Sequence, residues 1–349
     1  MTIRKELLEI PEALQQMAEV GRPACDALVR RINWGDKPVF IIGDGASYPA
    51  ALGGAWAFES ILGTPAVVRR PAAFSAVTNM ALSVRSLVIV VDGPQNPQDT
   101  LAAARRAKNR GAIVWAVTSD PAGELAGMAD GVVNDYEGES AGEGTRAVFC
   151  RHAAMLFLVV AAAKVLKAPT AALNAQEEEL GRLGQHVVWI VEKISDAASA
   201  LAKELAALQD VAFLGGGAFH PVALQAAERL RRTTGIKSRG IDLLDFQQEF
   251  PSISQPDSGI IYLSSSRCGL KAQVHQSASE ARQQGKHRIL AVTDANDRQL
   301  SERADLSVLL PGLTEASGAL IALAFLELVA YYAALAGSPA TARRRRSGS

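Results

Sequence analysis

The chain has 349 residues with 36 basic and 36 acidic side chains, and hydrophobic residues make up 48% of it. A chain of this length is too long for a single small domain and indicates two domains of ordinary size or a duplicated unit. The balanced charge disfavours a nucleic-acid binder, which normally carries a basic surplus, so no nucleic-acid partner is expected. The three cysteines, Cys25, Cys150 and Cys268, form neither a disulfide framework nor a zinc-binding pattern, and a cytoplasmic location is expected.

The N-terminal segment, residues 1–34, is charged and amphipathic and is expected to be helical, with breaks near Pro11 and Pro23. Its opening residues lack the apolar centre of a signal peptide. The most apolar run, Ala153–Leu166, is too short and too rich in alanine for a membrane span. No membrane partner is therefore expected.

The chain contains an internal repeat. Gly43–Leu52 reads GDGASYPAAL and Gly215–Leu224 reads GGGAFHPVAL, with six of ten positions identical at an offset of 215 − 43 = 172. The same offset pairs the apolar run Leu87–Val91 with Gly259–Leu263. Several blocks that agree in the same order predict two copies of one domain.

Each copy alternates short apolar runs with amphipathic stretches. The first copy, residues 35–168, contains PVFIIG, SLVIVVD, AIVWAVT and GVVND, and the second, residues 210–337, contains DVAFLGG, GIIYLSS, RILAVTD and LSVLL. Nearly continuous hydrophobicity is typical of strands buried on both faces. The pattern predicts an α/β fold in which each copy is a doubly wound parallel sheet flanked by helices. Residues 169–209 are expected to form a connecting helical segment, and residues 338–349 a basic, disordered tail.

Ligands of such sheets bind at the carboxyl ends of the strands, where the loops of the first copy begin at Gly43, Asp92, Ser119 and Asp135. No Walker lysine, complete dinucleotide fingerprint or histidine cluster is present in the sequence. We therefore expect neither a cofactor nor a metal.

Three segments resemble the sugar isomerase (SIS) domain. They are the GDGASYPA turn at Gly43–Ala50, the LVIVV run with the loop that ends at Asp99 and Thr100, and the GEGTRAVF segment at Gly142–Phe149. The tandem arrangement is similar to that of the isomerase half of glucosamine-6-phosphate synthase, and to aminosugar isomerases and fructosamine deglycases. The resemblance implies two tandem SIS domains, a sugar or amino-sugar derivative as ligand, and a homodimer in which a neighbouring subunit completes each site.

The resemblance also implies a substrate loop that departs from the family pattern. Ser47 matches the serine of the first turn, and Asp92–Thr100, DGPQNPQDT, stands where the family has a phosphate-binding SxSGxTxDT. Asp92 would repel a phosphate dianion, and Pro94 and Pro97 lack the N–H donors that a phosphate cradle uses. Two alternatives remain: the loop forms only a turn in which Asp92 caps the next helix, or the pocket accepts a neutral or amino-bearing group.

The segment Glu139–Arg146, ESAGEGTR, stands where the family approaches the sugar. The carboxylates of Asp44, Asp92 and Glu143 are expected on converging loops, where they would recognise hydroxyl or ammonium groups. The substrate-binding candidates are Asp44, Ser47, Asp92, Gly93, Gln95, Thr100, Glu139, Glu143, Thr145 and Gln248.

Isomerisation through an enediol requires a base, and the resemblance implies that the catalytic positions have changed. Matched without gaps, the glutamate of the family falls on Arg232, and a guanidinium cannot act as a base. The ring-opening histidine of the family falls on Gln248 or Glu249, depending on a slip of one residue, and His220 lies in the second glycine-rich turn. The catalytic candidates are Glu249, His220 and Arg232.

The sequence thus predicts an enzyme that acts on a sugar or amino-sugar derivative, by aldose–ketose isomerisation or by deglycation of a ketosamine. Its phosphate loop is degenerate and its catalytic residues are altered. The alternative is a non-catalytic sugar-binding or regulatory module. If the site lies in the second copy instead, the loop Ser264–Arg267 is where it is expected.

Overall fold

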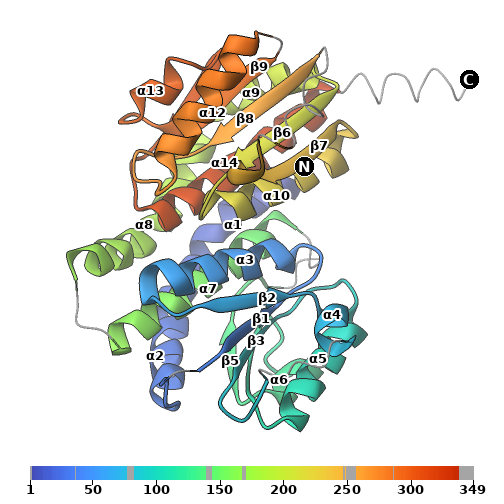
Figure 1. Cartoon of the computed structure of the whole chain (residues 1–349), viewed down its shortest axis with the longest axis vertical. Helices are drawn as coiled ribbons and strands as arrows, with labels where there is room; N and C mark the ends of the chain where they lie inside the picture. The colour runs from blue at the N-terminus through green and yellow to red at the C-terminus, as the bar shows by residue number, and fades with distance from the viewer. Residues whose placement is uncertain are drawn as a thin grey trace, which may run out of the picture. The chain divides into compact units, whose positions relative to one another are not determined.

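The structure, a computed structural model, describes residues 2–35, 37–76, 82–138, 144–166, 170–246, 248, 257–285 and 287–337. The chain forms two compact units (Figure 1). Glu9–Gly184 is the N-terminal unit, and Gln185–Ser349 with Met1–Leu8 is the C-terminal unit.

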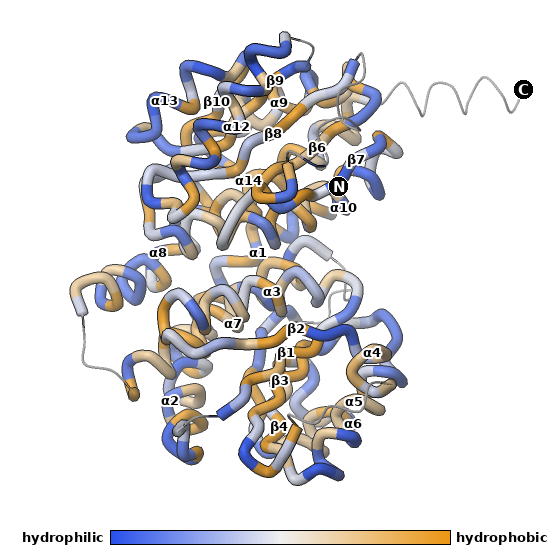
Figure 2. Tube along the Cα trace, in the orientation of Figure 1, coloured by the Kyte–Doolittle hydropathy of each residue, from blue (hydrophilic) through white to orange (hydrophobic). Residues whose placement is uncertain are grey.

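The N-terminal unit is built on a five-stranded parallel sheet in the order β2-β1-β3-β4-β5. Its strands are β1 (Val39–Ile42), β2 (Ala66–Arg69), β3 (Leu87–Val91), β4 (Ile113–Thr118) and β5 (Gly131–Asn134). Every residue of β1 and β3 is buried, as the continuous apolar runs predict. These strands are among the most hydrophobic parts of the trace (Figure 2).

Helices cover both faces of this sheet. In Figure 1, α3 and α7 lie on one side, and α4, α5 and α6 lie on the other. The helical elements that lie wholly in this unit are η1 (Met17–Gly21), α2 (Arg22–Arg30), α3 (Ser47–Ala57), η2 (Phe58–Leu62), α4 (Pro71–Ala76), α5 (Pro97–Asn109), α6 (Glu124–Met128) and α7 (Thr145–Leu166). Two further helices, α1 (Thr2–Gln16) and α8 (Ala171–Lys193), continue from one unit into the other.

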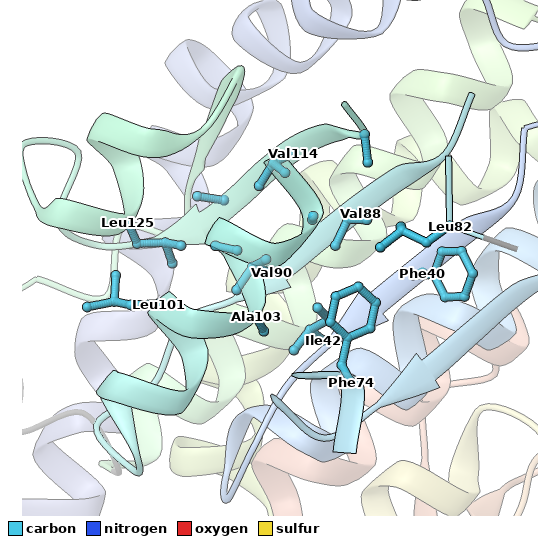
Figure 3. Close-up of a cluster of buried hydrophobic side chains, with 14 residues drawn as sticks. Phe40, Ile42, Phe74, Leu82, Val88, Val90, Leu101, Ala103, Val114 and Leu125 are labelled. Carbon is cyan, nitrogen blue, oxygen red and sulfur yellow. The ribbon is translucent and has the colours of Figure 1, made fainter. Parts of the chain in front are cut away.

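Every second residue of β3 packs into the hydrophobic cluster under α4 and α5 (Figure 3). Val88 and Val90 of β3 are completely buried and pack in one cluster with Phe74 of α4 and with Leu101 and Ala103 of α5. Side chains two residues apart on a strand point to the same face, so the residues between them face the other helices. Both faces of the sheet are thus covered, and its carboxyl edge is left for the loops.

The C-terminal unit repeats this topology. Its parallel sheet has the order β10-β9-β8-β6-β7, the same order of strands along the repeat as in the first sheet. Its elements are α9 (Ser195–Ala206), β6 (Asp210–Gly215), α10 (Phe219–Thr234), β7 (Lys237–Asp242), η3 (Leu243–Asp245), β8 (Ser258–Leu263), α12 (Lys271–Gln284), β9 (Arg288–Asp294), α13 (Arg298–Ser301), β10 (Leu306–Leu310) and α14 (Glu315–Ala336). The predicted α/β class with two parallel, helix-flanked sheets is confirmed.

Two strands are missing from the sequence prediction. Both β2 and β7 lie at sheet edges, and neither is buried along its whole length. Their sequences, AVVR and KSRGID, are not continuously apolar. The expected helix break near Pro11 is wrong, because Pro11 lies inside α1. Pro23 lies in the first turn of α2, where its missing N–H needs no partner. The basic tail lies outside the described residues.

Among the described residues, two helices, α7 and α14, are long and apolar enough to cross a membrane by length and composition. Most of each helix is buried within the structure, as the core helix of a water-exposed domain would be. Their apolar character is therefore explained by packing, and it is weak evidence for a membrane span. The three cysteines are buried and free.

Candidate functional site

The sheet of the N-terminal unit has its topological switch point between β1 and β3, where the strand order reverses. The loops that leave these two strands begin at Gly43 and Asp92. Ligands of open parallel sheets bind in the crevice at this point, so the predicted substrate-binding residues on these loops define the candidate site.

Ser47 lies at the first position of α3 and is buried. Its hydroxyl donates a hydrogen bond of 2.5 Å to the backbone carbonyl of Asp92, which joins the two loops. A Cβ added to Gly93 would lie 2.5 Å from the Ser47 hydroxyl oxygen. Glycine at this position is therefore what allows the second loop to approach the first turn closely.

The carboxylate of Asp92 is bound inside the loop. Its Oδ1 accepts the N–H of Gly93 at 2.8 Å, and its Oδ2 accepts the hydroxyl of Thr118, at the end of β4, at 2.9 Å. The interpretation of Asp92 as a helix cap is wrong, because Asn96 occupies the N-cap position of α5 and no side chain caps that helix. The N–H that a bound anion would need at Gly93 is instead held by a carboxylate of the chain itself.

Asp44 connects the same two loops from the solvent side. Its Oδ1 accepts a hydrogen bond from Arg70 at 2.8 Å, and its Oδ2 accepts one from the Asn96 amide at 2.7 Å. Burial alone would raise the pKa of Asp44, but these hydrogen bonds and the charge of Arg70 hold that pKa below its ordinary value. The Arg70 guanidinium also lies 4.2 Å from the centre of the Tyr48 ring. The loops that carry Asp44 and Asp92 are thus linked through Asn96, while the two carboxylates have different partners.

The remaining predicted residues of this unit differ in their surroundings. Gln95 lies against Gly45, which has a φ of +50° and no room for a Cβ beside the Gln95 side chain. Thr100 is buried, and its hydroxyl points to the backbone carbonyl of Asn96 at 3.4 Å. Thr145 is buried at the start of α7. The predicted residues Glu139, Glu143 and Glu249 lie outside the described residues.

His220 in the C-terminal unit lies in the first turn of α10, with its Nδ1 3.4 Å from the Asp242 carboxylate. Burial lowers the pKa of His220, and the charges of Asp242 and Asp245 oppose this effect. Burial thus favours the neutral form of the imidazole.

Arg232 is exposed in the last turn of α10, 232 − 220 = 12 residues from His220. At 1.5 Å per residue this separates the two backbone positions by about 18 Å. The structure does not bring these two candidates together. Gln248 is exposed.

The alternative site in the C-terminal unit is filled by the chain itself. The N–H of Ser266 donates to Asp294 at 2.7 Å, and the N–H groups of Ala218 and Gly269 donate to the Glu315 carboxylate at 3.2 and 2.8 Å. These carboxylates take the donors that an external anion would use. The Ser264–Arg267 loop is therefore a poor anion site.

Three buried charged residues of the N-terminal unit were not predicted from the sequence: Asp135, Glu137 and Arg151, which are 1%, 4% and 3% exposed. They follow β5 or lie on α7, close to the candidate site. Burial raises the pKa of Asp135 to about 6 and that of Glu137 to about 7, although the charge of Arg151 lowers both. One signal was available, because the loop after β5 was predicted to face the ligand and contains both carboxylates.

Among the described residues, no group of three or more His, Cys, Asp or Glu side chains is arranged to hold a metal ion.

Comparison with known proteins shows a similarity to one family over part of the chain. Residues 34–165 match the SIS domain family. A glutamine–fructose-6-phosphate aminotransferase (isomerizing) from Chlorobaculum tepidum is 25% identical over 345 residues, which cover 95% of this chain and 55% of the relative. The chain thus spans about half the length of the curated relatives that it matches.

Solved structures agree on the fold. The C-terminal domain of glucosamine–fructose-6-phosphate aminotransferase from Francisella tularensis has a TM-score of 0.83 at 18% identity, with 96% of each chain covered. A candidate phosphosugar isomerase from Silicibacter pomeroyi has a TM-score of 0.79 at 20% identity, covering 96% of this chain and 98% of that one.

The protein is therefore an α/β protein with two parallel, helix-flanked sheets, and the SIS domain match covers the first of them. Residues 34–165 are similar to the SIS domain, and the chain is similar in sequence to glutamine–fructose-6-phosphate aminotransferases (isomerizing).

Proposed function

We propose that this protein is an enzyme that acts on a sugar or amino-sugar derivative by proton transfer next to a carbonyl group. The reaction is either aldose–ketose isomerisation, in which a proton moves between adjacent carbons, or cleavage of the C–N bond of a ketosamine by water. The SIS match and the names of the relatives, which refer to fructose-6-phosphate and phosphosugars, support a sugar derivative as the ligand.

The observation that carries the proposal is the state of the Asp92 loop. Its first N–H, at Gly93, is bound to the Asp92 carboxylate, and the prolines at positions 94 and 97 have no N–H to offer. The repulsion between a carboxylate and one unit of phosphate charge about 4 Å away is about 1 kcal/mol in water. At an effective dielectric near 20 it is about 4 kcal/mol. The loop therefore favours a ligand that presents hydroxyl or amino groups there over one that presents a phosphate.

The proposed acid–base residues are Glu249 and His220. A carboxylate and a neutral imidazole together can remove and return a proton near pH 7. Burial favours the neutral form of His220, the form that a proton acceptor needs. Arg232, at the far end of α10, would bind an acidic group of the substrate instead of acting as a base. A cytoplasmic homodimer in which a second subunit completes each site belongs to the same proposal.

A non-catalytic sugar-binding module is the second candidate. The exposed position of Arg232, where the family resemblance implies a base, favours it. Such a module would keep the crevice between β1 and β3 and bind the same class of sugar without turnover.

Turnover and binding of ketosamines and amino sugars by Glu249→Gln and His220→Ala distinguish the two candidates. If the protein is an enzyme, both variants lose turnover and retain binding, whereas Glu178→Gln and His186→Ala on α8 behave like the wild type. A wild-type protein that binds these sugars and converts none of them would refute the enzyme and support the binding module.

A further inference from the structure

Arg151 is an unusual residue for its position. It lies in α7, a helix whose residues are otherwise mostly apolar and buried, and only 3% of its side chain is exposed. Burial of a guanidinium is unfavourable unless charged and polar partners compensate for the lost water. A helix that served only to cover the sheet would bury an apolar side chain here.

The partners of Arg151 come from the loop that follows β5. Its Nη2 lies 2.7 Å from Glu137 Oε2, and its Nε lies 3.8 Å from Asp135 Oδ2. The backbone N–H of Glu137 donates to Asp135 Oδ1 at 3.2 Å, which links the two acidic residues locally. One cation thus fixes two carboxyl groups at the carboxyl end of β5.

Hydrogen bonds of two adjacent residues at the end of β4 link this cluster to the candidate site. The other oxygen of Glu137, Oε1, accepts the hydroxyl of Ser119 at 3.1 Å. The adjacent residue Thr118 donates its hydroxyl to Asp92 at 2.9 Å, and Asp92 binds the Gly93 N–H at 2.8 Å. The end of β4 is therefore held between two carboxyl groups, one from the loop after β5 and one from the candidate substrate loop.

We propose that Arg151 is a positioning residue for the Asp92 loop, acting through Glu137 and the end of β4. The guanidinium fixes Glu137, Glu137 fixes Ser119, and the neighbouring Thr118 orients the Asp92 carboxylate. The statement that Asp92 faces a sugar derivative rests on the proposed function. The positioning of the Asp92 loop by Arg151 does not depend on it. The charge of Asp92 also contributes to the raised pKa values of Asp135 and Glu137, which places the three carboxyl groups in one electrostatic network.

Stability alone does not account for this cluster. Replacement of a buried ion network by apolar or neutral side chains of similar size is often neutral or stabilising. The cluster lies at the sheet edge where ligands of this fold bind, and its hydrogen bonds lead to the loop predicted to touch the substrate.

The test is hydrogen exchange of the full chain, measured by mass spectrometry on peptides that cover residues 92–96. Pro94 has no amide hydrogen, so the signal comes from few positions that include Gly93. The triple variant Arg151→Met, Asp135→Asn and Glu137→Gln removes all three charges and leaves no buried charge unpaired. We expect exchange in the loop to become about tenfold faster or more, while exchange in β3 stays unchanged.

Two further variants keep the test decisive. Arg151→Lys keeps the charge but loses the planar fork, and we expect it to give an intermediate exchange rate even if the triple variant fails to fold. The matched control is Arg229→Met with Glu327→Gln, which removes another buried pair, at 2.7 Å, from the C-terminal unit. This control should leave the loop unchanged.

Unchanged exchange in residues 92–96 in both the triple variant and Arg151→Lys would overturn the positioning role. Equal acceleration in the control would overturn it as well, because the effect would then be general destabilisation. Binding of sugars is measured on the same samples. If the wild type binds no sugar while the loop responds as expected, the proposed function fails and the positioning role stands.

Discussion

Replacement of Glu137 by Gln is expected to flatten the pH dependence of stability of the N-terminal unit. Burial raises the pKa of Glu137 to about 7 from its ordinary value of 4.5, against the opposing charge of Arg151. Between these two values the folded chain retains a proton that the unfolded chain has released. The free energy of unfolding therefore falls as the pH rises from about 4.5 to about 7.

The magnitude follows from the two pKa values. The difference between about 7 and 4.5 corresponds to about 3 kcal/mol, since one pKa unit is about 1.4 kcal/mol. Asp135, whose pKa burial raises to about 6, acts in the same direction and shares Arg151 with Glu137, so the loss belongs to the pair. His152 acts in the opposite direction, because burial lowers its pKa to about 4, and comparison of variant with wild type cancels its effect.

The assay is urea unfolding at about pH 5.5 and about pH 8, followed by tryptophan fluorescence. Of the four tryptophans, Trp34, Trp56 and Trp115 lie in the N-terminal unit and report its unfolding. Because this interval starts above the ordinary pKa of 4.5, Glu137 accounts for about 2 kcal/mol of the loss and Asp135 for about 1 kcal/mol or less. The wild type should therefore lose about 2–3 kcal/mol and Glu137→Gln about 1 kcal/mol or less. Equal losses in the two proteins would refute the reasoning that burial, and not Arg151, dominates the pKa of this carboxyl group.

Three further predictions concern the two sets of loops. Gly93→Ala places a Cβ 2.5 Å from the Ser47 hydroxyl oxygen and should lower the free energy of unfolding by about 1–3 kcal/mol, measured by thermal unfolding. A free energy of unfolding equal to that of the wild type would contradict the close approach of the Asp92 loop to Ser47. Glu315→Ala leaves two backbone N–H groups of the C-terminal unit without their acceptor and should lower the unfolding free energy by about 2 kcal/mol in urea titrations, and an unchanged midpoint would argue against this contact. Arg70→Ala removes a side chain that is 55% exposed and should change the free energy of unfolding by less than about 1 kcal/mol. Because Arg70 binds Asp44, the substitution should alter the affinity for sugar, measured by calorimetry. An unaltered affinity would show that the Arg70–Asp44 pair does not belong to the site.

The sequence predicted those parts of the fold that depend on local composition. Strands buried on both faces, such as β3, read as continuous apolar runs, and the repeat identified their counterparts. The edge strands β2 and β7 escaped prediction because neither is buried along its whole length, and Lys237–Asp242 contains four polar or charged residues among six.

The candidate site divides in the same way. The loops at Gly43 and Asp92 follow from the rule that ligands bind at the carboxyl ends of parallel strands. The contact between Asp92 and Thr118 depends on the pairing of β3 with β4, which places these residues at adjacent strand ends. Arg151 gave no signal, because its partner Glu137 is brought to it only by the packing of α7 beside the sheet.

The most direct test of the central claim, that the N-terminal unit has lost its preference for phosphate, is thermal stabilisation of the whole chain by paired ligands. Fructose, glucosamine and fructosyl-amino acids are compared, each with and without a 6-phosphate. A ligand at about 100 times its Kd should stabilise the folded state by about 2.7 kcal/mol. The account predicts that unphosphorylated or amino-bearing members raise the melting temperature, and stabilisation by the phosphorylated members alone would contradict it.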